Sequence, residues 1–101
     1  MFVLGQVPFG PDGFMVHGSI EVQTRVVLEG IKKQLEEVGC TMQDIVKTTI
    51  WLDDPRDFAG YNKVFAEYFP KDPPARATVR SQLLLDCKIE VEAVAYKPQK
   101  G

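Results

Sequence analysis

Histidine, cysteine and long apolar runs are scarce in this sequence, and each scarcity excludes a class of function. The 101 residues include one histidine and two cysteines, and Cys40 and Cys87 do not form a CxxC motif. We therefore expect neither a disulfide framework nor a zinc site, and both thiols are interpreted as structural. No apolar run approaches the roughly 20 residues of a membrane-spanning helix. The N-terminus lacks the charge and the apolar core of a signal peptide, so we expect a cytoplasmic protein with no membrane partner.

An excess of positive charge is also missing. Twelve basic and fourteen acidic residues give a net charge of −2, whereas proteins that bind nucleic acid broadly present a basic surface. The charge balance argues against a nucleic-acid partner. There is no phosphate-binding glycine loop, no metal-ligand cluster and no Ser/His/Asp arrangement. The length, without repeat or linker, fits a single domain at 1–101.

Turn-forming residues separate the stretches that have strand or helix periodicity. Ser19 is predicted to cap a helix that ends before Gly39. Asp54 and Pro55 are predicted to begin a second helix that Pro70 ends. The stretch 41–44 reads as a capping box around one helical turn. Strands are predicted at 1–6, 14–17, 45–52, 75–84 and 88–96, followed by a polar tail at 97–101.

The order ββαβαββ indicates an α+β fold in which both helices lie on one face of one sheet. The predicted strand 45–52 is nevertheless apolar on both faces. Two helices cannot cover both faces, so the uncovered face is expected to bury against another copy of the chain. One face of this strand carries Val46, Ile50 and Leu52, and the other carries Ile45 and Trp51.

Arg76 is the first candidate for chemistry, because it begins a predicted strand directly after a proline-rich turn. It alternates with Thr78 and Arg80 onto one face. A planar guanidinium can hold a carboxylate or a phosphate with two parallel hydrogen bonds. The alternative is a surface arginine in a salt bridge, which is the more common role.

Glu90 and Glu92 share one face of the last predicted strand. They could meet water, pair with Arg76 or Arg80 across the sheet, or provide a partly buried carboxylate that orients a water molecule. The only histidine, His17, has no evident partner and is interpreted as a surface residue. An aromatic stripe in the second helix is interpreted as core and consists of Phe58, Tyr61, Phe65 and Tyr68.

Five short segments, in this order and spacing, resemble the Rid family, also called the YjgF family, over essentially the whole chain. Each segment is weak alone, but five together are specific. They are Gly5-Gln6-Val7-Pro8, Ile45-Val46-Lys47-Thr48-Thr49, Asp57-Phe58-Ala59 with Asn62, Pro74-Ala75-Arg76, and Lys88-Ile89-Glu90-Val91-Glu92-Ala93-Val94-Ala95.

The resemblance implies a chorismate-mutase-like α+β fold, a mixed sheet with two helices on one face, and a homotrimer with clefts between neighbouring subunits. It also implies hydrolytic deamination of 2-imino acids and enamines, 2-iminobutanoate and 2-iminopropanoate, without a cofactor. Arg76 matches the arginine that grips the substrate carboxylate, and Glu90 matches the acid that holds the attacking water. Gly5 matches a backbone position that lines the cleft. Thr78 stands where many relatives have a cysteine that acts through its backbone N–H.

The resemblance also defines one departure and two alternatives. Relatives begin one strand earlier, with a tyrosine that lines the cleft, and we expect this chain to lack both. Some relatives are described as endoribonucleases or translation inhibitors. The other alternative is a trimer that binds small acids without catalysis. Binding of 2-ketobutyrate without imine turnover would favour that last alternative.

Overall fold

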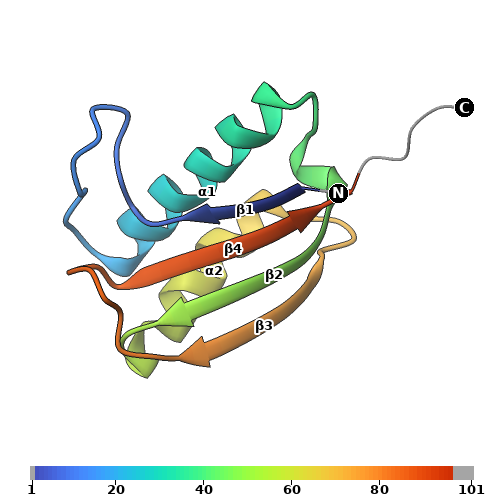
Figure 1. Cartoon of the computed structure of the whole chain (residues 1–101). Helices are drawn as coiled ribbons and strands as arrows, with labels where there is room; N and C mark the ends of the chain where they lie inside the picture. The colour runs from blue at the N-terminus through green and yellow to red at the C-terminus, as the bar shows by residue number, and fades with distance from the viewer. Residues whose placement is uncertain (1, 97–101) are drawn as a thin grey trace, which may run out of the picture.

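The computed structural model describes residues 2–96, so the predicted tail at 97–101 lies outside the described residues. Within that part of the chain, strands and helices alternate until the last two elements, which are both strands (Figure 1), and 3-10 turns lie at Met42–Asp44 and Pro55–Asp57. The bounds are β1 Phe2–Gln6, α1 Ile20–Glu37, β2 Ile45–Leu52, α2 Phe58–Tyr68, β3 Ala75–Arg80 and β4 Ile89–Ala95.

The strands form one mixed sheet in the order β1-β4-β2-β3. β4 runs antiparallel to both of its neighbours, and β2 and β3 run parallel. α2 makes the crossover between the two parallel strands, since parallel strands cannot be joined by a tight turn. Both helices lie on the same side of the sheet in Figure 1. The predicted α+β fold class and the placement of both helices on one face are thus confirmed.

The helix-covered face of the sheet carries the core. Alternate residues of the central strands point into it, as the pleat of a β-strand requires. They meet the inward side of α1 and Tyr61 and Phe65 of α2, whereas Phe58, which was also predicted as core, is 47% exposed. The most deeply buried members are Val27, Leu28, Ile31, Leu35, Ile50, Tyr61, Val64, Ile89, Val91, Ala93 and Ala95.

The predicted helix ends are confirmed by local hydrogen bonds. The Ser19 hydroxyl accepts from the Val22 N–H at 3.2 Å, and Gly39 has a φ of 75°, where a side chain would be strained. The Asp54 carboxylate accepts from the Arg56 N–H at 2.9 Å. The first turn after it is a 3-10 turn that continues into α2. The capping box at 41–44 is also present.

Two predicted strands are wrong in extent. Residues 14–17 form no strand, because the chain folds back on itself at once: the Gly10 N–H donates to the Phe14 carbonyl at 2.9 Å, leaving a single bridge between Phe9 and Met15. The predicted strand 75–84 ends at Arg80. β2 ends at Leu52, so residues beyond 80 have no neighbouring strand with which to pair.

The start of β2 corrects a predicted side-chain direction. Val46 was expected on the same face as Ile50, but Val46 is 51% exposed and Ile45 is 6% exposed. The pairing of β2 with β4 skips a residue between Ile45 and Lys47. Such a bulge reverses the alternation before it, so Ile45 points into the core in place of Val46.

Candidate functional site

β3 presents Arg76 and Thr78 at the edge of the helix-covered face. In the register of the parallel pair, Arg76 lies beside Thr48 and Thr78 lies beside Ile50. Both β2 residues are buried, at 1% and 0% exposed, and paired residues of neighbouring strands point the same way. The predicted alternation of Arg76 and Thr78 onto one face is therefore confirmed, and that face is the one that α2 covers.

The Arg76 guanidinium is held by α2. Its Nη1 donates to the Asn62 Oδ1 at 2.6 Å. Its central carbon lies 4.8 Å from the centre of the Phe65 ring and 5.6 Å from that of the Tyr61 ring. A cation over aromatic faces is attracted by the ring quadrupole. One hydrogen bond and two ring contacts therefore restrict the direction of the Arg76 side chain.

The charge of Arg76 is not neutralised by these contacts. Asn62 offers a neutral amide oxygen, and a guanidinium has five N–H donors. Within residues 2–96, the ion pairs join Arg25 to Glu67 and Arg56 to Asp54. The alternative in which Arg76 makes a surface salt bridge is therefore wrong for this part of the chain. An exposed, oriented and uncompensated guanidinium can accept a carboxylate from outside the chain.

Thr78 is tied to the same helix. Its Oγ1 lies 3.0 Å from the Tyr61 hydroxyl, and either oxygen could be the donor. Tyr61 is fully buried, so this hydrogen bond fixes the Thr78 side chain beside the Arg76 contacts. A hydroxyl at this position excludes thiol chemistry here. That Thr78 contributes its backbone N–H to a ligand stays a prediction.

Glu90 lies on the opposite face of the sheet from Arg76. It follows Ile89 in β4 and pairs with Trp51 of β2. Since Ile89 is buried in the core, Glu90 points away from both helices. β3 is not a neighbour of β4, so the interpretation that Glu90 or Glu92 pairs with Arg76 or Arg80 across the sheet is wrong. One chain alone does not bring Arg76 and Glu90 together.

Gly5 shares the face of Glu90, at the far edge of the sheet from Arg76. It pairs with Glu92 in the register of β1 and β4. Its carbonyl accepts from the Gln34 Nε2 at 3.3 Å. An added Cβ would meet nothing within 4 Å, so within this chain the position is open. The four predicted site residues therefore divide into Arg76 and Thr78 on one face, and Glu90 and Gly5 on the other.

The uncovered face, called here the open face, mixes apolar and charged positions. Val3 is 63% exposed and Val79 is 44% exposed, while Trp51 and Glu90 are half-buried. Its positions, by register, are Val3, Gly5, Lys47, Thr49, Trp51, Ala75, Ala77, Val79, Glu90, Glu92 and Val94. That this face buries against another copy stays a prediction.

Sequence reasoning missed the supporting roles of Asn62 and Phe65. Asn62 entered only as part of a motif, and Phe65 only as core. The signal was the spacing of Tyr61, Asn62 and Phe65 along one helix that immediately precedes β3. A crossover helix packs over the two strands that it joins, so these side chains can be expected beside the first residues of β3.

The remaining candidates are the histidine and the two cysteines of the sequence. His17 is exposed, Cys40 and Cys87 are buried, and burial raises the pKa of the Cys87 thiol. Among residues 2–96, no group of three or more His, Cys, Asp or Glu side chains is arranged to hold a metal ion. None of the helices in the same range is long and apolar enough to cross a membrane.

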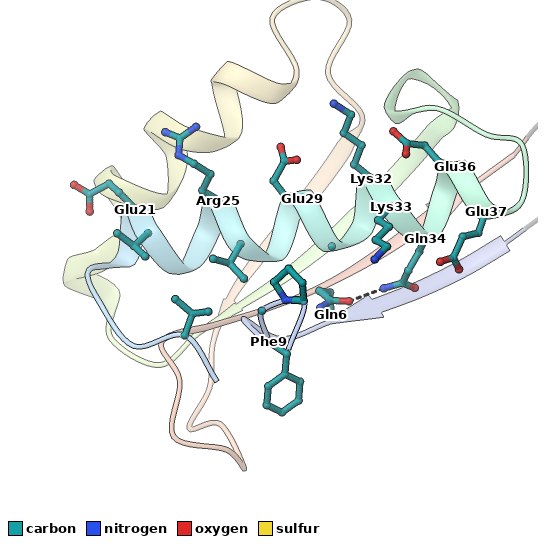
Figure 2. A pocket seen from close by; sticks show the side chains of 16 residues that line it. Gln6, Phe9, Glu21, Arg25, Glu29, Lys32, Lys33, Gln34, Glu36 and Glu37 are labelled. Carbon is teal, nitrogen blue, oxygen red and sulfur yellow. Dashed lines mark hydrogen bonds between the residues drawn. The ribbon is translucent and has the colours of Figure 1, made fainter. Parts of the chain in front are cut away.

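A groove with a volume of about 1180 Å³ lies between α1 and the loop that follows β1. Figure 2 shows Gln6 and Phe9 on one side of it and the side chains of α1, from Glu21 to Glu37, on the other. Arg76, Thr78 and Glu90 do not line it. This groove is therefore separate from the predicted site residues.

The comparisons with known proteins agree on one family. Residues 1–97 match the family model described as Endoribonuclease L-PSP. A RutC family protein of Pyrococcus abyssi is 48% identical over 99 residues, which are 96% of this chain and 78% of that protein. The structure of a putative endoribonuclease from Thermotoga maritima superposes with a TM-score of 0.90 at 39% identity, covering 95% of this chain and 77% of the other. A structure from Yersinia pestis, assigned to the Rid family, gives a TM-score of 0.87 at 39% identity, with 91% and 75% covered.

Proposed function

This chain belongs to the L-PSP endoribonuclease (Rid) family, and we propose that it hydrolyses reactive 2-imino acids to 2-keto acids and ammonia. The proposed substrates are 2-iminobutanoate and 2-iminopropanoate. The observation that carries the proposal is Arg76, an exposed guanidinium held by Asn62 and two aromatic rings and left without a carboxylate partner among residues 2–96. Such a group suits a substrate whose one fixed charge is a carboxylate beside the reacting carbon.

Arg76 would bind the substrate carboxylate and so fix the position of C2. A hydrogen bond to a charged group contributes about 1.5–3 kcal/mol, and a two-pronged pair also sets the orientation. Free imines already hydrolyse in water, so holding C2 and water in line supplies much of the acceleration.

Glu90 would orient the attacking water. The water oxygen bonds to C2 while the C=N π electrons move to nitrogen, and one water proton passes to that nitrogen, giving a carbinolamine. The proton of the new hydroxyl then also passes to nitrogen, with Glu90 as the relay for both transfers. The C2–N bond then breaks as the C=O bond forms, and ammonia leaves. The net reaction is imino acid plus water to keto acid plus ammonia, so it needs no redox partner.

Because Arg76 and Glu90 point from opposite faces of the sheet, the proposed site is shared between two subunits. Each cleft would combine Arg76 of one chain with Glu90 of its neighbour. The apolar side chains of the open face support an assembly of this kind, since the exposed Val3 and Val79 and the half-buried Trp51 would gain from burial. We propose a homotrimer, which closes a ring of three such clefts.

The first experiment measures diversion of imine. 2-Iminobutanoate is generated in situ by threonine dehydratase and trapped competitively by semicarbazide, and the protein is compared with Arg76→Ala and Arg76→Lys. We expect the unaltered protein to suppress trapping and both variants to lose about a hundredfold or more in kcat/KM, because an ammonium cannot reproduce the planar fork. Near-normal turnover by Arg76→Lys would rule out the two-pronged clamp.

A mixing experiment tests the shared site. Arg76→Ala and Glu90→Gln are purified separately, dissociated, mixed and reassembled. If each cleft uses residues from two chains, random mixing should restore about a quarter of the normal activity, because half of the Arg76 positions and half of the Glu90 positions in the clefts are intact. A mixture that stays as inactive as its parents would show that both residues serve the same chain's cleft.

Endoribonuclease activity is the second candidate, favoured by the names of the family model and of the Thermotoga maritima protein. The Arg76 fork could hold a phosphate as readily as a carboxylate, and Arg80 lies on the same face. Cleavage of a single-stranded RNA that Arg76→Ala abolishes would support this candidate. No cleavage by a preparation that turns over imine would exclude it.

A further inference from the structure

Gln23 is a polar residue of α1 that the proposed chemistry does not use. It is 2% exposed, and its side-chain amide is hydrogen-bonded at both ends to backbone. Its Oε1 accepts from the Lys88 N–H at 2.7 Å, and its Nε2 donates to the Val16 carbonyl at 3.0 Å. A donor at one end and an acceptor at the other define the orientation of the amide. The side chain thus bridges the segment before α1 and the segment before β4.

The segment that Gln23 holds leads directly into Glu90. Lys88 is the residue before β4, and Glu90 is the second residue of that strand. The Lys88 carbonyl accepts from the Asp53 N–H at 3.2 Å. Lys88 is therefore fixed on one side by Gln23 of α1 and on the other by the end of β2. Figure 1 shows the start of β4 beneath the first turns of α1.

From this geometry we propose that Gln23 is a positioning residue for Glu90. The inference rests on the proposed function in one respect, which is that Glu90 orients the attacking water. Gln23 lies on the helix-covered side of the sheet and Glu90 on the open side, so Gln23 acts through the main chain and does not touch substrate. By holding the Lys88 N–H, it fixes where β4 begins and hence where the Glu90 carboxylate stands on the open face.

The test compares Gln23→Met, which keeps the length of the side chain and removes both hydrogen bonds, with Val27→Ala as a matched control. Val27 is a fully buried residue of the same helix. Its truncation therefore destabilises the protein but keeps the hydrogen bond between Gln23 and the Lys88 N–H. We expect Gln23→Met to lower kcat about tenfold with KM within about twofold, since a misplacement of one ångström can cost a hundredfold. Affinity for 2-ketobutyrate, which depends on Arg76, should stay unchanged. Equal losses of kcat in both variants would overturn the proposal.

Amide hydrogen exchange gives a second readout that needs no turnover. Gln23→Met should speed exchange at Lys88 and Glu90 by about tenfold more than Val27→Ala does, because it removes the acceptor of the Lys88 N–H. Exchange reports such local opening residue by residue. Unchanged exchange at these two amides would overturn the proposal whatever the activity. Absence of imine turnover in the unaltered protein would count against the proposed function alone, and the exchange result would still decide the role of Gln23.

Gln23→Glu keeps the test open if Gln23→Met does not fold. A carboxylate still accepts from the Lys88 N–H, but it cannot donate to the Val16 carbonyl. We expect the Lys88 amide to stay protected from hydrogen exchange and kcat to stay within about twofold of that of the unaltered protein. A tenfold loss of kcat with Lys88 still protected would contradict the proposal, because Glu90 would then be misplaced by something other than the missing Lys88 hydrogen bond.

Discussion

The two faces of this sheet are built from the same strands but are completed in different ways. On the helix-covered face, Ile50, Ile89 and Val91 are at most 1% exposed. On the open face, Val3 and Val79 remain 63% and 44% exposed beside charged residues. The helices of one chain therefore bury these residues of the first face completely. The second face keeps apolar surface that only another molecule can remove from water.

The candidate chemistry divides along the same line. Arg76 is oriented by contacts within its own chain, on the covered side, whereas Glu90 stands on the side that one chain leaves unfinished. Folding is thus completed on the helix-covered face, whereas the proposed assembly would be completed on the open face. Substitutions can therefore separate the stability of the chain from its association.

The largest effect is expected from a charge placed on the open face. Val79→Glu would put a second carboxylate near Glu90, since both flank Trp51 in the register. A buried like charge costs several kcal/mol at an interface, so the assembly should dissociate into folded monomers. Molar mass by size-exclusion chromatography with light scattering measures this. Val22→Glu, at the same 44% exposure on α1, should leave the assembly intact, and equal dissociation of both variants would contradict the assignment.

Neighbouring residues of β2 test the covered face against the open face directly. Ile50→Ala should lower the free energy of unfolding by about 2–5 kcal/mol, because it leaves a cavity in the core. Thr49→Ala, one residue earlier and on the open face, should change it by less than about 0.5 kcal/mol in the dissociated chain. Urea denaturation gives both values. Similar losses would mean that the open face is already packed within one chain.

The stability contributed by Tyr68, which links α2 to Glu29 of α1, should depend on alkaline pH. Burial, followed by the hydrogen bond to Glu29, raises the pKa of Tyr68 to about 12, compared with about 10 in an unfolded chain. The stability that the neutral phenol contributes is complete below pH 10 and is lost as the pH rises toward 12. Tyr68→Phe should cost about 1 kcal/mol at neutral pH and should flatten this decline. Thermal melts at neutral and at alkaline pH measure the decline. Tyr96→Phe, an exposed control, should show the same decline as the unaltered protein.

A pair of buried threonines gives the smallest effect, of opposite sign at the two positions. The Thr24 hydroxyl is fully buried and has no hydrogen-bond partner among residues 2–96, whereas the Thr48 hydroxyl donates to the Ala75 carbonyl at 3.4 Å. Thr24→Val should stabilise the protein by about 0.5–1 kcal/mol, because it removes an unsatisfied polar group. Thr48→Val should destabilise it. Melting temperatures suffice to rank the two, and a loss in Thr24→Val would refute the first expectation.

The sequence was a good guide to the helices and central strands because their signals are local. Ser19, Gly39 and Asp54 act within one turn of the chain, and alternation along 88–96 needs no partner to be recognised. The predicted strand 75–84 was too long because its end depends on where β2 stops. The direction of Val46 was wrong because a bulge is a property of two paired strands.

The sequence indicated which residues to propose for the candidate site, but not how they are arranged. The family resemblance selected Arg76, Thr78, Glu90 and Gly5, yet no local pattern shows that Arg76 and Glu90 face opposite ways. That follows from strand order and register, which join residues far apart in the chain. The support of Arg76 by Asn62 likewise depends on how α2 crosses over β3.

The position of β4 has a consequence for how the protein is made. β4 is the last strand of residues 2–96, yet it lies between β1 and β2 at the centre of the sheet. A ribosome delivers the chain in order, so β1 and β2 have no shared neighbour until residues 89–95 leave the exit tunnel. The β2–α2–β3 unit has shorter-range contacts and can form earlier. A nascent chain would thus build the support for Arg76 first and insert the strand that carries Glu90 last.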